Sequence, residues 1–474
     1  MEIIQNKEEL IKYHNKVKSF NICINAIEEA INSVDPFVLI QKSVEIRKQF
    51  TDKIKLKEGQ NYKIANKNNI LVIRDVKRKD FNFNLDKFDS IHIVGAGKAT
   101  AKMAIALEEI LLKKNYQINS GAINIPYNEK FKPKFIKVTE ASHPIPDKNC
   151  VKGTKYILDL LKNIKNRSIV FVLISGGASA LLCSPTSGLE LKSKQRITEL
   201  LLKSGASIHE INKVRKHLSN VKGGNLVRYV NDDTMVVALI LSDVVGDDLN
   251  IIGSGPTIGD NSTYADAISI LKKYRIWEHR DKKELNKIVN ILEMGYNGYL
   301  QDLPRPNDPI FKNVCNILIG NNEIACKSAV SHIEKYGVKT FYLGSDFTSE
   351  AKIFGKNLAN ILLNDKLEMN WKEKEKEKEK EKKIRYSKSK NKIVAFVLGG
   401  ETVVKIESSN SLKKNSTFED KSKRVLTIGE GGRNQESLLS SVSYLNSVKL
   451  NDFTILCCGT DGIDGNSNYA GGIV

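Results

Sequence analysis

The sequence lacks the segments that carry a chain into or across a membrane. No apolar run is long enough to span a bilayer. The first twenty residues contain Glu2, Glu8 and Glu9 and no apolar core, so they do not resemble a secretory signal. They also contain no arginine, which makes them a poor mitochondrial presequence. We therefore expect a cytoplasmic protein without a membrane partner, and a mitochondrial location is less favoured.

Paired cysteine motifs are also missing. The seven cysteines show no regular spacing, and Cys457 and Cys458 lie inside an apolar run. An odd number without a framework is typical of buried thiols in a reducing compartment. Hydrophobic residues make up 41% of the 474 residues, which suits a globular enzyme with two to three domains' worth of chain.

The sequence has no recognisable nucleic-acid motif, although it is strongly basic. It holds 74 lysines and arginines against 55 acidic residues, a net charge of +19. The lysines are spread along the chain with few aromatic neighbours, so we expect no nucleic-acid partner. The positive field remains compatible with an acidic small substrate.

What the chain does contain is a repeated unit of apolar strand, glycine-rich turn and helix. Apolar runs of this kind occupy residues 90–94, 168–174, 235–241, 314–319, 393–398 and 453–458. Continuous apolar strands that alternate with helices predict an α/β fold with mainly parallel sheets covered on both faces. In such sheets ligands bind at the carboxyl ends of the strands, where these turns lie.

Composition divides the chain into two predicted α/β domains, 20–275 and 310–474. The segment 274–309 between them is polar and ends in Pro304, Pro306 and Pro309. Two low-complexity inserts, 372–383 and 408–423, are expected outside the packed core. Near the start, residues 21–50 follow a helical pattern, and Asp35 is expected to cap a second helix that begins at Pro36.

The Gly-Gly-Arg sequence at 431–433 opens a predicted helix after a predicted strand. The glycines allow a close approach to a ligand, and a helix start with unpaired N–H groups favours an anion. Arg433 adds a forked, permanently charged donor for phosphate or carboxylate. The alternative interpretation is a solvated arginine at an ordinary helix start.

Lys98 follows another glycine turn, where a lysine at a helix start is unfavourable unless an anion offsets its charge. The turn at 175–179 can form a backbone nest for phosphate, or it can serve strand–helix packing alone. Asn212 shares a helix face with Arg215, which suggests anion contact or an exposed charged face. Asp243 and Asp461 follow apolar strands, so they could hold Mg²⁺, act as a base or cap the next element.

Taken in order, these turns resemble the type II glycerate kinase family, whose C-terminal part is called the MOFRL domain. The segments that carry the resemblance are 94–99, 140–147, 175–181, 211–219, 222–224, 241–248, 253–257, 399–402, 431–436 and 459–465. Each is weak alone, and the ordered set is specific.

The resemblance implies transfer of a phosphoryl group from ATP, with Mg²⁺, to D-glycerate, typically giving 2-phosphoglycerate. It also implies two α/β domains, the first Rossmann-like, with the active-site cleft between them, and a monomer or a homodimer. Lys98 and Arg433 are expected to be catalytic, and Asp243 and Asp461 to bind the metal. Substrate and phosphate contacts are expected from Gly95, Gly97, Ser175, Gly176, Gly177, Ser179, Asn212 and Arg215.

The chain departs from the family pattern at its end. Family members usually continue beyond the segment at 459–465 to a further glycine-rich motif, so we expect a shortened MOFRL domain. A truncated, non-catalytic anion-binding protein is therefore one alternative. The other is an NAD(P)-dependent hydroxypyruvate reductase, but Thr100 stands where the dinucleotide fingerprint needs its third glycine.

Overall fold

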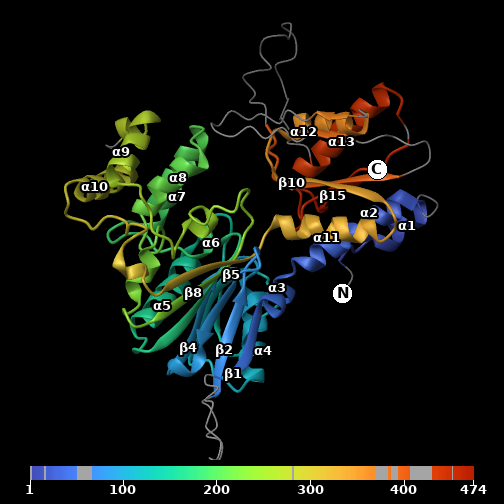
Figure 1. Ribbon diagram of the computed structural model, residues 1–474. Helices are drawn as coiled ribbons and strands as arrows, with labels where there is room; N and C mark the ends of the chain where they lie inside the picture. The colour runs from blue at the N-terminus through green and yellow to red at the C-terminus, as the bar shows by residue number, and fades with distance from the viewer. Residues whose placement is uncertain are drawn as a thin grey trace, which may run out of the picture. The chain divides into compact units, whose positions relative to one another are not determined.

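The structure is a computed structural model that describes residues 3–14, 18–50, 67–279, 282–363, 366–368, 383–385, 393–405, 430–450 and 452–474. The chain forms two compact units (Figure 1). One comprises Val34–Asn321, and the other combines Met1–Ser33 with Asn322–Val474. The predicted insert at 408–423 lies outside the described residues, as does the insert at 372–383 apart from Lys383.

A six-stranded parallel sheet forms the centre of the unit Val34–Asn321. Its strands are β4 (Ser90–Ala96), β5 (Ser120–Pro126), β6 (Lys137–Ala141), β7 (Ser168–Ile174), β8 (Met235–Leu241) and β9 (Val314–Gly320). Their spatial order is β6-β5-β4-β7-β8-β9, and every neighbouring pair is parallel. The direction of winding reverses between β4 and β7, which is where Rossmann-type folds bind ligands. The prediction of an α/β fold with a Rossmann-like sheet is confirmed.

Both faces of this sheet are covered, which explains why its strands are apolar throughout. Ile169, Phe171 and Leu173 of β7 pack in the same cluster as α4 (Thr100–Lys113). The intervening residues Val170, Val172 and Ile174 pack on the other face with α5 (Lys148–Lys162). Because successive side chains of a strand point to opposite faces, both sets need to be apolar.

A small antiparallel sheet precedes the large one. It consists of β1 (Val44–Phe50), β2 (Lys67–Arg74) and β3 (Asp80–Asn84), followed by η1 (Leu85–Lys87). The expected cap at Asp35 is confirmed, because its carboxylate accepts N–H bonds from Phe37 and Val38 at the start of α3 (Pro36–Ser43). The helical pattern predicted up to residue 50 is wrong beyond α3. Val44 and Ile46 alternate as buried residues of β1, and a short apolar run does not reveal its period.

Short helices follow β7 and β8 and complete this unit. They are α6 (Ala178–Leu181), α7 (Leu191–Lys203), α8 (Ile208–His217), η2 (Asn225–Tyr229), η3 (Ile252–Ser254), α9 (Tyr264–Lys273), η4 (Trp277–His279), α10 (Lys283–Tyr296) and η5 (Pro309–Phe311). Helices α7 to α10 share an apolar cluster of their own. Figure 1 shows these four helices gathered beyond the sheet.

The second unit joins the beginning of the chain to its later part. Its elements are α1 (Lys7–His14), α2 (Lys18–Ser33), α11 (Asn322–Glu334), β10 (Lys339–Phe347), α12 (Ala351–Leu363), β11 (Lys366–Glu368), β12 (Lys383–Arg385), β13 (Val394–Gly400), α13 (Arg433–Ser447), β14 (Leu456–Cys458) and β15 (Gly471–Ile473). Strands β10 and β13 pair in parallel, α12 packs on α13, and α2 lies along α11 (Figure 1).

The division into units differs from the predicted domains 20–275 and 310–474. Strand β9 pairs with β8 in the large sheet, although the composition suggested a boundary before it. Helix α2 packs on α11, so residues 18–33 belong to the second unit. Composition identifies a strand or a helix but does not reveal which sheet or neighbour it joins, because that depends on contacts far apart in sequence. Among the described residues, no helix has both the length and the apolar character that a bilayer crossing requires.

Candidate active site

The turns after β4 and β7 meet at the point where the winding of the sheet reverses. The N–H of Lys98 donates to the Gly176 carbonyl at 2.8 Å, and the N–H of Ser175 donates to the Ala96 carbonyl at 3.3 Å. A Cβ at Gly97 would lie 2.8 Å from the Ser175 carbonyl oxygen, and the φ of Gly97 is +143°. Only glycine permits this approach without strain. The two turns therefore form one hydrogen-bonded edge, as their positions in the sequence predicted.

Ser175 has a structural task within this edge. It is buried, and its hydroxyl oxygen accepts the Ala99 N–H at 3.0 Å and lies 3.3 Å from the Thr100 hydroxyl. The side chain of Ser175 thus holds the beginning of α4 against the β7 turn. Its predicted contact with phosphate stays a prediction. Gly95 is also internal, because a Cβ there would lie 2.8 Å from Leu173 Cβ in the neighbouring strand.

Three polar side chains surround the glycine pair Gly176 and Gly177. A Cβ on Gly176 would lie 2.7 Å from Cγ of Asp243. A Cβ on Gly177 would lie 2.9 Å from Cδ2 of His143 and 3.3 Å from Cγ of Lys98. Lys98, His143 and Asp243 follow β4, β6 and β8, so three strand ends converge on the turn after a fourth. We call Lys98, His143, Gly176, Gly177 and Asp243 the switch-point site.

The backbone of the glycine pair suits an anion. Gly177 has a φ of +83°, the left-handed conformation that glycine adopts readily. Within the described part of the chain, neither the Gly176 nor the Gly177 N–H donates a backbone hydrogen bond. Consecutive N–H groups of this kind form concave anion-binding nests.

The charges at this site are unevenly buried. Lys98 and Asp243 are exposed, whereas His143 is half-buried. Burial, followed by the nearby positive charge of Lys98, lowers the pKa of His143 below its ordinary value. His143 is therefore neutral near pH 7, and the positive charge of the site rests on Lys98.

Asp243 is the carboxylate of the switch-point site. The described residues contain no cluster of three or more His, Cys, Asp or Glu side chains able to hold a metal. Mg²⁺ does not require one, because it commonly binds through one or two carboxylates together with water and substrate phosphates. The neighbouring Asp247 accepts a bond from Asn321 at 2.6 Å, and Asp248 accepts the Asn250 N–H at 2.9 Å. Asp243 thus fits a site of this sparse type.

Ser179, Asn212 and Arg215 come together next to this glycine turn, and their predicted contact with substrate or phosphate stays a prediction. Arg215 donates to the Ser179 carbonyl at 3.3 Å and makes a weaker contact with Asn212 Oδ1 at 3.5 Å. Ser254 joins them, with its hydroxyl 2.8 Å from the Ser179 hydroxyl and 3.3 Å from Asn212 Oδ1. Lys222 donates to the Ser179 carbonyl at 2.6 Å.

Sequence reasoning did not single out three members of these groups. Lys222 and Ser254 belong to glycine-rich segments that carry the family resemblance, so that pattern could have pointed to them. His143 lies in the segment 140–147, which also carries the family resemblance but contains no glycine. It follows β6 directly, and its position after a strand end was the available signal.

In the second unit, Arg433 begins α13 beside an internal carboxylate. Asp464 is buried and accepts the N–H groups of Asn434 at 3.0 Å and Gln435 at 2.8 Å. The Asn434 side-chain amide donates to the same carboxylate at 3.0 Å. The expectation of unpaired N–H groups at this helix start is therefore wrong at these two positions. Asp464 lies about thirty residues away in sequence, and no local pattern reveals such a contact.

The side chain of Arg433 is half-exposed and forms an ion pair with Glu401. Glu401 follows the Gly-Gly pair that ends β13, so two of the family-like segments meet in this unit. Asp461 is exposed, and its carboxylate accepts the Ile463 N–H at 3.4 Å in a turn. Lys98 and Arg433 belong to different units, and their action at one site stays a prediction, as does metal binding by Asp461.

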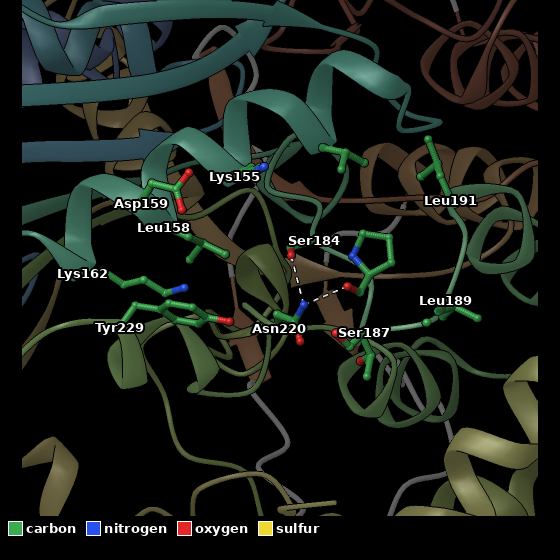
Figure 2. A pocket seen from close by; sticks show the side chains of 14 residues that line it. Lys155, Leu158, Asp159, Lys162, Ser184, Ser187, Leu189, Leu191, Asn220 and Tyr229 are labelled. Carbon is green, nitrogen blue, oxygen red and sulfur yellow. Dashed lines mark hydrogen bonds between the residues drawn. The ribbon is translucent and has the colours of Figure 1, made fainter.

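A cavity of about 430 Å³ lies elsewhere in the sheet-containing unit (Figure 2). It is lined by α5, the loop before α7, and Tyr229. Figure 2 shows Asn220 beside this cavity, where its amide donates to the Ser184 hydroxyl at 3.2 Å and the Pro185 carbonyl at 2.8 Å. None of the predicted site residues lines it. Because the converging strand ends lie elsewhere, we do not assign it to the active site.

Together, the fold and the switch-point site define a two-unit α/β protein with a glycine-rich, hydrogen-bonded edge on a Rossmann-like sheet. Residues 22–289 match the family model described as "Domain of unknown function (DUF4147)", and residues 394–474 match the MOFRL family. A "Glycerate 2-kinase" of Pyrococcus horikoshii is 33% identical over 96% of this chain and 85% of its own length.

A "D-glycerate 2-kinase" of Thermotoga maritima is 36% identical over 85% of this chain and 81% of its own length. A crystal structure of glycerate kinase from the same organism aligns with a TM-score of 0.67 and 31% identity, covering 96% of this chain and 86% of that one. A "Putative hydroxypyruvate reductase" of Agrobacterium vitis is 32% identical over 81% of this chain and 75% of its own length. The chain belongs to the type II glycerate kinase family.

Proposed function

We propose that the protein is a glycerate 2-kinase, an enzyme that transfers a phosphoryl group from ATP to D-glycerate and yields 2-phosphoglycerate. The observation that carries this proposal is the convergence of Lys98, His143 and Asp243 on the Gly176–Gly177 turn. The site lies at the strand edge where such sheets bind phosphorylated ligands. The similarity to glycerate 2-kinases over most of the chain supports the same activity.

The chemistry needs positioning and charge neutralisation more than covalent help from the protein. We assign the N–H groups of Gly176 and Gly177 to hold phosphate oxygens, and Lys98 to neutralise charge that develops during transfer. Asp243 would hold Mg²⁺, which would supply positive charge to offset that of the phosphate groups. The exposed carboxylate against a glycine backbone fits such an ion.

His143 contributes shape and polarity without a second positive charge. Because its pKa is lowered, its imidazole presents one donor and one acceptor nitrogen near pH 7. We assign it to orient the substrate next to Lys98. Its neutrality leaves Lys98 as the cation of the turn, which keeps substrate binding from becoming too strong in the ground state.

Arg433 is proposed to add a second, forked cation during phosphoryl transfer. This role requires Glu401 to release the guanidinium or to move with it, because the two are now paired. We further propose a cytoplasmic monomer or homodimer. All seven cysteines are free, which suits a reducing compartment.

The residues fit a nicotinamide-dependent hydroxypyruvate reductase less well. Thr100 stands where the third glycine of the dinucleotide fingerprint would be, and it is fully buried. That glycine normally permits close packing of the helix on the strand, and here a threonine fills the position. We therefore favour the kinase over the reductase, and over an anion-binding protein without catalysis.

The test is a coupled assay for ADP release with ATP, Mg²⁺ and D-glycerate, with the product identified by phosphorus NMR. Wild type should release ADP and form the 2-phosphate. Lys98→Met should lower kcat/KM on the order of a hundredfold or more, while Lys113→Met, at the exposed end of α4, should retain full turnover. Oxidation of NADH with hydroxypyruvate in place of ADP release would identify the reductase. Absence of both reactions would favour the non-catalytic anion-binding protein.

A further inference from the structure

Two cationic side chains contact Ser179 next to the glycine turn, and a third interacts with them. Lys222 donates to the Ser179 carbonyl at 2.6 Å and to its hydroxyl at 3.1 Å. Arg215 donates to the same carbonyl at 3.3 Å. The charge of Lys194, on α7, acts on Lys222 and is itself affected by Arg215. We call Lys194, Arg215 and Lys222 the buried cation cluster.

The cluster is enclosed. Lys194 is 3% exposed and Lys222 is 1% exposed, which is uncommon for lysine. Burial lowers the pKa of Lys194 to about 8. Burial and the charges of Arg215 and Lys194 hold the pKa of Lys222 well below its ordinary value. The surroundings therefore disfavour the charged forms of both lysines.

Some of the donors in this cluster have no acceptor. Among the described residues, Lys194 Nζ and Arg215 Nε are buried without a hydrogen-bond partner. By contrast, the nearby buried Lys216 has Asp260 as a partner at 2.5 Å. The chain thus supplies a counter-charge for one buried lysine and leaves two unpaired donors beside it.

A purely structural role explains Lys222 but not Lys194. Lys222 satisfies two oxygens of Ser179, as a packed lysine should. Lys194 has an ammonium with no acceptor, and a buried charge without a partner is strongly unfavourable. Such an arrangement persists where a ligand of opposite charge completes it.

We propose that Lys194, Arg215 and Lys222 form a subsite for one oxyanion, a carboxylate or a phosphate group of a substrate. The inference rests on the proposed function in one respect, since ATP and D-glycerate carry these two groups. Arg215 and Ser179 are partly exposed, whereas Lys194 is buried. Ser179 follows Gly177 by two residues, so the subsite adjoins the switch-point site.

The subsite divides the work of substrate binding between two adjacent places. The exposed Lys98 meets the group that reacts, and the buried cation cluster holds a group that does not. Desolvated donors recognise an oxyanion more strongly than exposed ones, because little water competes for them. The cluster would thereby select for substrates with a second anionic group at the right distance.

The test is isothermal titration of the full chain with inorganic phosphate, D-glycerate and ADP separately, at constant ionic strength in chloride. Wild type should show saturable binding of at least one probe. Lys194→Met keeps most of the length of the side chain and removes its charge, so it should weaken binding of that probe on the order of tenfold to a hundredfold. Lys203→Met is the matched control, since Lys203 lies on the same helix with an exposed side chain paired to Glu199.

The probe whose binding Lys194→Met weakens identifies the source of the oxyanion. Wild-type affinity of Lys194→Met for all three probes would overturn the inference, and so would a wild type that binds none of them. Lys194→Gln serves if the methionine variant fails to fold. ADP release is measured on the same samples: normal turnover with unchanged binding in Lys194→Met removes the subsite and leaves the proposed function standing.

Discussion

Removal of the Asp464 carboxylate should loosen the helix that begins with Arg433. Asp464 accepts two backbone N–H groups at 2.8 and 3.0 Å and one side-chain amide at 3.0 Å, all at the first turn of α13. Loss of a helix cap costs about 0.5–2 kcal/mol, and hydrogen bonds to charged groups contribute about 1.5–3 kcal/mol. Because these contributions overlap, we expect Asp464→Ala to destabilise α13 by roughly 2–3 kcal/mol.

Hydrogen exchange is the appropriate assay, because a two-unit protein need not unfold in a single step. The amides of residues 433–447 should exchange roughly 30- to 160-fold faster in Asp464→Ala, the factor that 2–3 kcal/mol represents. Exchange in β4 and β7 should not change. The matched control is Asp452→Ala, which replaces an exposed carboxylate in the same unit and should change stability by less than about 0.5 kcal/mol.

Activity provides the second readout for Asp464→Ala. Arg433 is the first residue of α13, so a frayed first turn should lower kcat/KM with D-glycerate at saturating ATP. Unchanged exchange in residues 433–447 would refute the argument that Asp464 holds this helix start. Faster exchange with full turnover would confirm that Asp464 caps α13 and would remove Arg433 from the mechanism.

Three further outcomes are expected. Arg433→Lys should lower turnover about a hundredfold, since loss of the forked contacts removes roughly 3 kcal/mol of transition-state stabilisation; wild-type steady-state kinetics would return Arg433 to the solvated surface. Gly176→Ala should displace the Asp243 carboxylate, which lies within 2.7 Å of the added Cβ, and raise the Mg²⁺ concentration needed for half-maximal rate; an identical Mg²⁺ titration would contradict this. A hydrogen bond from Lys273, first among several, lowers the pKa of Glu210 to about 2 from 4.5, so its stabilising effect is present above pH 4.5 and lost as the pH falls towards 2. Glu210→Gln should therefore show a shallower loss of stability across that window in acid unfolding.

The sequence predicts local features of this fold well. Apolar runs followed by glycine turns predict β4, β7 and β8 and the edge at which their loops meet. The Asp35–Pro36 pair predicts the start of α3, because a cap and its helix are adjacent in the chain. These signals are read within a few residues, and the structure confirms them.

Features that depend on distant contacts could not be predicted in the same way. Asp464 caps a helix that begins some thirty residues earlier, and β9 joins a sheet whose neighbouring strand ends more than seventy residues before it. Lys194 occupies a helix whose other lysines are at the surface, and only packing against α8 reveals that its ammonium is enclosed. Burial of a charge is set by tertiary neighbours, so composition and periodicity do not predict it.

The pairing of α2 with α11 affects the order in which the protein can be completed during synthesis. The sheet-containing unit is one continuous stretch, so it can fold as soon as it leaves the ribosome. Helix α2 is made before that unit, yet its partner α11 follows almost three hundred residues later. At roughly 5–20 residues per second, α2 waits on the order of 15 to 60 seconds with Phe20, Ile22 and Ile24 uncovered. During that interval α2 offers an apolar segment that a nascent-chain chaperone could cover until α11 emerges and packs against it.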